Sequence, residues 1–180
     1  MYGIPEYRLP KAVVRNEIKR IEALGVTFVT NCLVGDPQSG VTVDSLFADG
    51  FDAIFMGTGT ALPQNLNIPG ANLRRVTQST DFLHNVNAYM EGAMPYEMVP
   101  LRRGDRVAVI GGGNVAMDAA RTAKRLGADV TVVYRRTQAE MPAIKSEYDD
   151  AVAEGVKFMW QTNSIEFIGN EKGRVCAIRL

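Results

Sequence analysis

The sequence predicts an α/β fold, with a parallel sheet in its second half and a strand-rich segment in its first half. Three observations support this prediction. Apolar strands alternate with helical patterns between residues 106 and 160, a glycine cluster joins the first of those strands to its helix, and the apolar runs of the first half are short and separated by turns. A content of 46% apolar and 22% charged residues is typical of a folded globular protein.

Two helices are expected in the first half. Residues 10–24 carry apolar side chains at helical spacing, with a proline that suits the first turn, and Gly25 offers a left-handed stop. A second helix should begin at Ser79 or Thr80, whose hydroxyl could cap it, and should end near Gly92.

Short strands and one domain boundary complete the expectation for the first half. The strands are predicted from apolar runs next to turn residues, at 26–30, 41–43 and 53–56. Residues 91–104 carry two prolines, two glycines and no periodicity, which packed elements avoid. We therefore expect one domain over residues 1–95 and another over residues 96–180.

The second half has a regular pattern of strands and helices. Strands and helices alternate over 106–110, 114–126, 129–134, 143–153 and 156–160, followed by a hairpin of 164–168 and 174–180. Such a βαβαβ series predicts a parallel sheet with right-handed crossovers.

The glycine cluster follows the first strand of that series and fits the pattern G-x-G-x-x-A. Gly111 permits a tight turn, Gly113 lets a pyrophosphate approach the backbone, and Ala116 lets the helix pack on the strand. The free N–H groups of the helix would then face the phosphates. This predicts a Rossmann-like dinucleotide site made of Gly111, Gly112, Gly113, Asn114, Val115 and Ala116, although a turn that binds nothing is the alternative.

Two arginines stand where the second strand of the series ends. In NAD-specific sites an acidic residue at that place binds the ribose 2′-hydroxyl. Here the strand ends in Arg135 and Arg136, whose guanidinium groups match the charge and geometry of a 2′-phosphate. The sequence therefore predicts NADP(H) as the cofactor, with two solvated arginines as the alternative.

Composition excludes several other classes of function. Twenty basic and twenty acidic residues leave no net charge, so we expect neither nucleic acid nor a membrane as partner. No targeting or membrane-spanning stretch is visible, which indicates a soluble cytoplasmic chain. Cys32 and Cys176 are expected to be isolated buried thiols without a metal.

The remaining polar candidates predict no catalytic residue. His84 has no nucleophile or carboxylate at catalytic spacing, which indicates a structural role. Asn114 and Asp118 lie one helical turn apart, where stabilising the helix is a sufficient role and a position near the nicotinamide is the alternative.

Four motifs in a fixed order give the sequence a resemblance. These are Gly3–Lys11, Asp52–Thr60, Gly111–Arg121, and Tyr134–Arg136 with Glu140–Ala143. Over essentially all 180 residues the chain resembles the small subunit family of NADPH-dependent glutamate synthase. Similar segments occur in the flavin part of dihydropyrimidine dehydrogenase and in NADPH-dependent ferredoxin oxidoreductases. In the segment 73–76, Arg75 stands where the resemblance leads us to expect a glycine.

The resemblance implies a flavoprotein with electron transfer. Hydride would pass from NADPH to FAD, and electrons would pass on to a glutamate synthase large subunit or an iron–sulfur protein. It would place Gly3–Lys11 and Gly57, Thr58 and Gly59 in the FAD half, where a strand ending in Gly-Thr-Gly brings backbone close to a ligand.

The resemblance also implies that the chain is a middle fragment of such an enzyme. The first FAD fingerprint of the family, its cysteine-rich region and the return to the FAD domain have no counterpart in the 180 residues. We therefore expect this chain to hold no FAD alone, to be inactive alone and to self-associate through uncovered apolar faces. The alternative is a stand-alone NADP(H)-binding module without turnover. A thiol–disulfide reductase is disfavoured, because no C-x-x-C pair exists.

Overall fold

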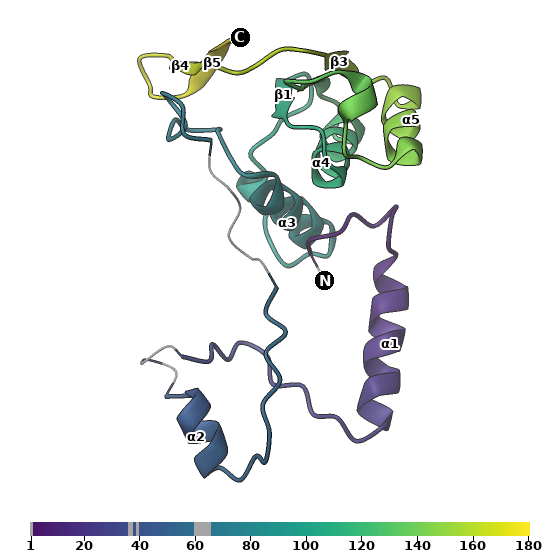
Figure 1. Ribbon diagram of the computed structural model, residues 1–180, viewed down its shortest axis with the longest axis vertical. Helices are drawn as coiled ribbons and strands as arrows, with labels where there is room; N and C mark the ends of the chain where they lie inside the picture. Colours follow the sequence, from purple (N-terminus) through teal and green to yellow (C-terminus); the bar gives the residue numbers. More distant parts are fainter. Residues whose placement is uncertain (1, 36–37, 39, 60–65) are drawn as a thin grey trace. The chain divides into compact units, whose positions relative to one another are not determined.

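The computed structural model describes residues 2–35, 38, 40–59 and 66–180 (Figure 1). The chain forms two compact units. The first contains residues 1–11 and 63–180, and the second contains residues 12–62. The first unit is therefore built from two stretches of sequence that are separated by the whole of the second unit.

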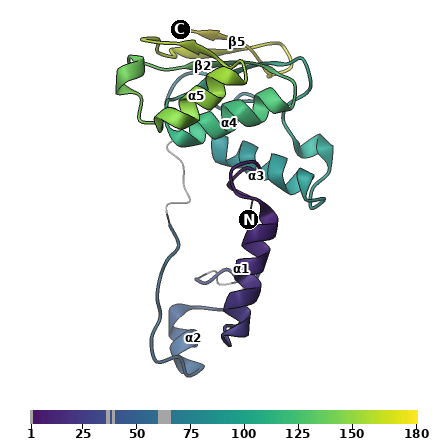
Figure 2. The ribbon, with the colours of Figure 1, turned by 90° about the vertical axis from the view of Figure 1, so that its right-hand side faces the viewer.

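A three-stranded parallel sheet lies at the centre of the first unit. Its strands are adjacent in the order β1 (Arg106–Ile110), β2 (Asp129–Val133) and β3 (Lys157–Met159). The crossovers contain α4 (Asn114–Arg125) and α5 (Lys145–Ala153), and both helices lie on the same side of the sheet in Figure 2. The predicted α/β fold with a parallel sheet is confirmed, and α5 begins two residues later than expected.

The core of the first unit forms where α4 packs on the sheet. Val130 and Val132 of β2 and Met117 of α4 are fully buried. The helix α3 (Ser79–Met90) adds Leu83 and Val86 to the same core. Small residues of α4, among them Ala119, Ala120 and Ala123, allow the close approach of helix and sheet.

The segment 91–104 belongs to this core. It contains the short helix η1 (Tyr96–Met98), and Val99 and Leu101 after it are buried. The expected boundary at residues 95–96 thus falls inside the first compact unit. As a boundary between two cofactor domains it stays a prediction.

The expected hairpin at the end of the chain is confirmed. It pairs β4 (Glu166–Gly169) with β5 (Val175–Arg179) in antiparallel register. Arg74 connects the hairpin to the segment before α3, through the bonds Arg74 N–H to Gly173 O at 3.0 Å and Val175 N–H to Arg74 O at 3.1 Å. The next residue, Arg75, has a φ of +70°, a left-handed conformation that explains the expectation of a glycine there.

The second unit contains α1 (Lys11–Ala23, whose first residue belongs to the first unit) and α2 (Val43–Ala48). The first confirms the helix expected at residues 10–24. The start of α2 is fixed by a capping box, in which Thr42 and Ser45 each accept a hydrogen bond from the backbone N–H of the other, at 3.0 and 2.9 Å.

The three strands expected in this part of the chain were wrong predictions. The described residues of the second unit contain no strand at 26–30, 41–43 or 53–56. A short apolar run needs a neighbouring strand for its N–H and C=O groups, and the described part of this unit supplies none. The run at 41–43 instead enters α2, since Thr42 caps that helix.

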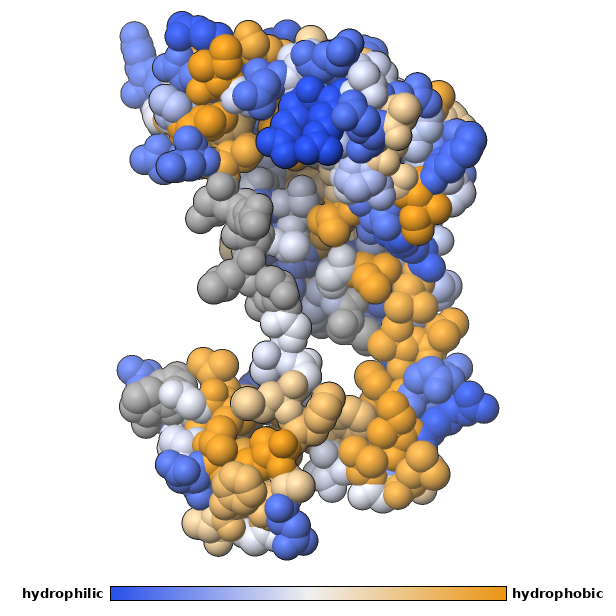
Figure 3. Space-filling model, viewed as in Figure 1, coloured by the Kyte–Doolittle hydropathy of each residue, from blue (hydrophilic) through white to orange (hydrophobic). Residues whose placement is uncertain are grey.

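Large apolar side chains are exposed in the second unit. Among them, Leu24 is 83% exposed and Phe55 is 94% exposed. Figure 3 shows apolar surface gathered over this unit. In the ranges that the structure covers, no helix is long and apolar enough to cross a membrane.

Candidate functional site

The glycine cluster forms a tight turn between β1 and α4. Gly111 has a φ of +128°, a conformation that other residues rarely adopt. Its N–H donates to Val133 O of β2 at 3.0 Å, so the turn continues the parallel pairing by one residue. Gly113 is the N-cap of α4, and the helix begins at Asn114.

The space beside Gly113 is open. A Cβ added at Gly113 would meet no atom within 4 Å. At the described start of α4 no side chain caps the helix, and Val115 in its first turn is 49% exposed. The unpaired N–H groups and the positive end of the dipole therefore face accessible space, which fits a phosphate group.

Gly112 is constrained by close packing instead. A Cβ there would lie 2.8 Å from the Tyr134 ring and 2.9 Å from Met141 Cγ. The backbone also holds this residue, because Ala143 N–H donates to Gly112 O at 3.0 Å. The segment around Met141 thus supports the turn from behind, which explains why glycine is required at the middle position of the cluster.

Asn114 also links the glycine turn to the segment that precedes α5. Its Oδ1 accepts a hydrogen bond from the N–H of Ile144 at 2.9 Å, which joins the start of α4 to the entrance of α5. This contact favours the structural role of Asn114 over a position at the nicotinamide.

Arg135 and Arg136 follow β2 and are exposed. They lie at the same edge of the sheet as the glycine cluster, because β1 and β2 run parallel and Ile110 is opposite Val133. Two backbone bonds join their loop to the chain after β3, from Gln161 N–H to Arg136 O and from Thr162 N–H to Tyr134 O, both at 3.1 Å. The two guanidinium groups therefore project toward solvent from a loop whose backbone is fixed by hydrogen bonds.

A second hydrogen-bonded turn braces the loop from its other end. Glu140 Oε2 accepts hydrogen bonds from the backbone N–H and the hydroxyl of Thr137, at 3.1 and 2.9 Å. These bonds hold the pKa of Glu140 below its usual value. The Tyr134 hydroxyl donates to Glu140 O at 3.0 Å, so the arginine loop and the glycine turn share Tyr134 as a support.

Segment 2–11 lies against α3, α4 and α5 of the first unit. Asn87 of α3 donates to Tyr2 O at 2.6 Å. The Tyr7 ring lies under two guanidinium groups of α4, with Arg121 Cζ at 4.6 Å and Arg125 Cζ at 3.9 Å from its centroid.

Arg8 connects this segment to two helices by ion pairs. Its Nη1 lies 2.6 Å from Asp118 Oδ2 of α4, and its Nη2 lies 3.2 Å from Glu147 Oε1 of α5. Asp118 is only 5% exposed, and its Oδ1 has no hydrogen-bond partner in the described structure. Burial raises the pKa of Asp118, and the Arg8 guanidinium opposes that rise.

Sequence reasoning missed the contact between Arg8 and Asp118. One signal was present, because Asp118 lies between Met117 and Ala119 in a run of small and apolar residues. A carboxylate in such a run needs a cationic partner. The sequence did not indicate that Arg8 would supply it.

Gly57, Thr58 and Gly59 lie in the second unit, and all three are exposed. They follow no described strand, so the prediction that a strand ends in these three residues was wrong. Thr60 lies outside the described residues. A flavin contact by these residues stays a prediction.

Neither cysteine is fully buried, and the histidine packs against an aromatic ring. Cys32 is half-buried and Cys176 is exposed, so the expectation of two buried thiols was wrong. Cys176 is on β5, a hairpin strand with a solvent-facing side. The His84 ring meets Tyr2 edge-on at 5.3 Å, as expected for a structural residue. Within the described ranges, no cluster of three or more metal-binding side chains exists.

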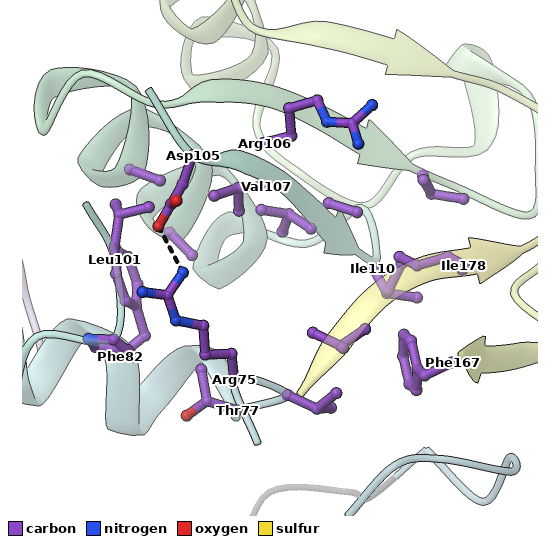
Figure 4. A pocket seen from close by; sticks show the side chains of 18 of the residues that line it. Arg75, Thr77, Phe82, Leu101, Asp105, Arg106, Val107, Ile110, Phe167 and Ile178 are labelled. Carbon is purple, nitrogen blue, oxygen red and sulfur yellow. Dashed lines mark hydrogen bonds and ion pairs between the residues drawn. The ribbon is translucent and has the colours of Figure 1, made fainter. Parts of the chain in front are cut away.

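A cavity of about 1230 Å³ lies along β1 (Figure 4). Residues of β1 and β5 line it together with Phe82 and Leu101. Arg75 points toward Asp105 in this view, and their ion pair is 2.8 Å long. None of the predicted cofactor residues lines this cavity.

Comparisons with known proteins agree on one family. Residues 4–179 match the family described as pyridine nucleotide-disulphide oxidoreductase. The NADP(+)-dependent formate dehydrogenase subunit beta of Moorella thermoacetica is 41% identical over 97% of this chain, and the glutamate synthase [NADPH] small chain of Halomonas elongata is 36% identical over 95%. This chain spans only 24% and 36% of the length of these two relatives.

A solved structure shows the same fold over nearly the whole chain. FprA of Mycobacterium tuberculosis in complex with NADPH aligns with a TM-score of 0.62 over 98% of this chain and 55% of its own. The sequence identity is 22%, so this likeness concerns the fold.

Proposed function

Since the chain belongs to the pyridine nucleotide-disulphide oxidoreductase family, we propose that its first unit binds NADP(H) at the start of α4. One observation carries the proposal. The open space at Gly113 and the exposed pair Arg135 and Arg136 lie at the same edge of the parallel sheet. A pyrophosphate and a 2′-phosphate are the groups that suit these two places.

The residues of this chain bind and orient the dinucleotide. The N–H groups at the start of α4 donate to the pyrophosphate, and the glycine turn leaves room for it. Arg135 and Arg136 pair with the 2′-phosphate. Tyr134 supports both the turn and the arginine loop, so it fixes the spacing between the two anion sites.

The parent enzyme would be a flavin-dependent oxidoreductase. NADPH supplies a hydride and FAD accepts it, since such chemistry belongs to the cofactors. Electrons would pass on to a partner such as a glutamate synthase large subunit or an iron–sulfur protein, as the similarity to glutamate synthase small chains supports. Gly57, Thr58 and Gly59 of the second unit would belong to the FAD half, whereas segment 3–11, expected there from the resemblance, packs on the unit proposed to bind NADP(H).

The test compares the affinities of NADP⁺ and NAD⁺ by titration calorimetry. We expect the unchanged chain to bind NADP⁺ more tightly, and R135A/R136A to lose this preference. Each charge-assisted contact that is lost should cost about 1.5 to 3 kcal/mol. Arg179→Ala is a matched control, because Arg179 is an exposed arginine paired with Glu166 on the hairpin. Equal dissociation constants in the unchanged chain would contradict the proposal.

A further inference from the structure

We propose that Arg8 is a positioning residue of the dinucleotide site, and that it acts by neutralising the buried Asp118 carboxylate inside the helix that receives the phosphates. This inference rests on the proposed function. This role requires no contact between Arg8 and the dinucleotide. Its effect on the cofactor passes through Asp118.

Asp118 lies close to the end of α4 at which the phosphates are expected. The helix begins at Asn114, and Asp118 follows four residues later, so its Cα lies about 6 Å further along the axis. Side chains of a helix tilt toward its N-terminus, which directs the carboxylate toward the end where the phosphates are expected. An unpaired negative charge at this place would oppose anion binding.

The charged groups around Asp118 show why Arg8 is the residue that neutralises its carboxylate. Segment 2–11 contributes Arg8 and also Tyr7, whose hydroxyl donates to Asp118 O at 3.4 Å. Helix α5 contributes Glu147, and α4 itself contributes Arg121. Arg121 is engaged by three carboxylates, those of Glu147, Asp150 and Glu154, at 3.3, 3.0 and 2.9 Å. Glu147 adds negative charge. Among the described ion pairs, Arg8 is the cation that meets the Asp118 carboxylate directly.

The same arrangement predicts that the loss of NADP⁺ affinity in a variant without Arg8 depends on pH. Without Arg8, the charged form of the buried carboxylate has no direct cationic partner among the described ion pairs. We expect about tenfold weaker NADP⁺ binding, because an uncompensated negative charge buried within the first turns of α4 opposes an anion at the N-terminus of that helix. Burial already raises the pKa of Asp118, and loss of Arg8 raises it further. The carboxylate is therefore protonated as the pH falls, and the loss of affinity should shrink.

The experiment measures NADP⁺ dissociation constants between pH 5.5 and pH 8, each as a ratio to the unchanged chain. Arg8→Gln removes the charge but keeps a hydrogen-bond donor, and Arg8→Lys keeps the charge. R8Q/D118N removes the charge of both partners. Arg20→Ala is the control for net charge, since Arg20 is an exposed residue of α1 paired with Glu17. Circular dichroism confirms that each variant is folded.

The expected results form one pattern. Arg8→Gln binds NADP⁺ about tenfold more weakly at pH 8, and the ratio moves toward one as the pH is lowered. Arg8→Lys retains most of the affinity, and R8Q/D118N recovers it at every pH. Arg20→Ala binds as the unchanged chain does.

Two other patterns overturn the inference. If Arg8→Gln binds like the unchanged chain, the charge of Arg8 has no effect on the site. If R8Q/D118N is as weak as Arg8→Gln and neither ratio changes with pH, Arg8 only holds the segment in place. Absence of NADP⁺ binding by the unchanged chain is a different result, because it refutes the proposed function and this inference together.

Discussion

Gly112 and Gly113 are neighbours in the sequence, but a side chain at each would meet different surroundings. At Gly113 an added Cβ finds open space, and the φ of this residue, −88°, suits any residue type. At Gly112 an added Cβ would lie 2.8 Å from the Tyr134 ring. Gly112 is therefore explained by the packing of the protein itself, whereas Gly113 has no such explanation and is left to the proposed pyrophosphate site.

This difference predicts opposite outcomes for two similar substitutions. Gly113→Val should abolish dinucleotide binding and leave the unfolding transition nearly unchanged, because the side chain occupies only the space of the pyrophosphate. Gly112→Val should destabilise the chain by about 1 to 3 kcal/mol, since Tyr134 and Met141 have to move. Titration calorimetry and thermal unfolding measure the two effects. Binding that survives in Gly113→Val would mean that the cluster is only a turn.

The residues of the glycine cluster could be predicted from the sequence because their pattern is local. Gly111 and Gly113 lie two positions apart, and the apolar strand before them is visible in the sequence. The ion pair of Arg8 with Asp118 joins residues 110 positions apart, and nothing in either local pattern indicates the other. Residues whose partners are distant in the sequence were therefore missed, even where one of them lies inside a recognised motif.

At the scale of elements, α4 and α5 are joined by a network of charges. Glu154 Oε1, at the end of α5, pairs with Arg121 Nη2 at 2.9 Å and with Arg125 Nη2 at 2.7 Å. Burial alone would raise the pKa of Glu154, but the hydrogen bonds from Arg125 and Arg121 outweigh it, and the pKa lies below its usual value. The carboxylate therefore stabilises the folded chain in its charged form.

Glu154→Gln should lower the stability of the chain at neutral pH. The expected loss is about 1.5 to 3 kcal/mol, as for hydrogen bonds to charged groups. A depressed pKa gives stability that is present above the unfolded value of about 4.3 and is lost as the pH falls through the folded value. The difference between variant and unchanged chain should therefore be larger at pH 7 than at pH 3. Urea unfolding at both pH values measures it.

The control for this prediction lies on the same helix. Asp149 of α5 pairs with Lys145 at the surface, where both side chains are more than half exposed. Exposed pairs contribute little to stability, so Asp149→Asn should change the unfolding free energy by less than about 1 kcal/mol at either pH. An equal loss in both variants would refute the role given to Glu154.

The elements of the second half were predictable, and those of the first half only in part. From β1 to β5 each strand has a partner supplied by the same stretch of sequence, so period and turn signals were sufficient. The apolar runs at 26–30 and 53–56 have the composition of strands, but the described part of their unit offers them no partner. Composition indicates what a run can form, and the available neighbours decide whether it forms.

At the scale of the whole molecule, the chain carries one glycine fingerprint for a dinucleotide, at Gly111–Ala116. We expect the purified 180-residue chain to contain no stoichiometric FAD and to oxidise NADPH negligibly with artificial acceptors. An FAD pyrophosphate needs its own helix N-terminus, and a few secondary contacts do not offset the cost of immobilising so large a ligand. Absorbance of the purified chain measures bound flavin. About one equivalent per chain would contradict this prediction.

The division of the first unit into two stretches of sequence has a consequence for biosynthesis. Residues 2–11 leave the ribosome before α4 and α5, although Arg8 and Tyr7 have their partners on these helices, more than 100 positions later. The sheet and its two helices, in contrast, come from the continuous stretch 106–159 and can assemble as soon as it is synthesised. Segment 2–11 therefore cannot dock until α4 and α5 have been synthesised, and a translation product that stalls before these helices would leave the segment unbound.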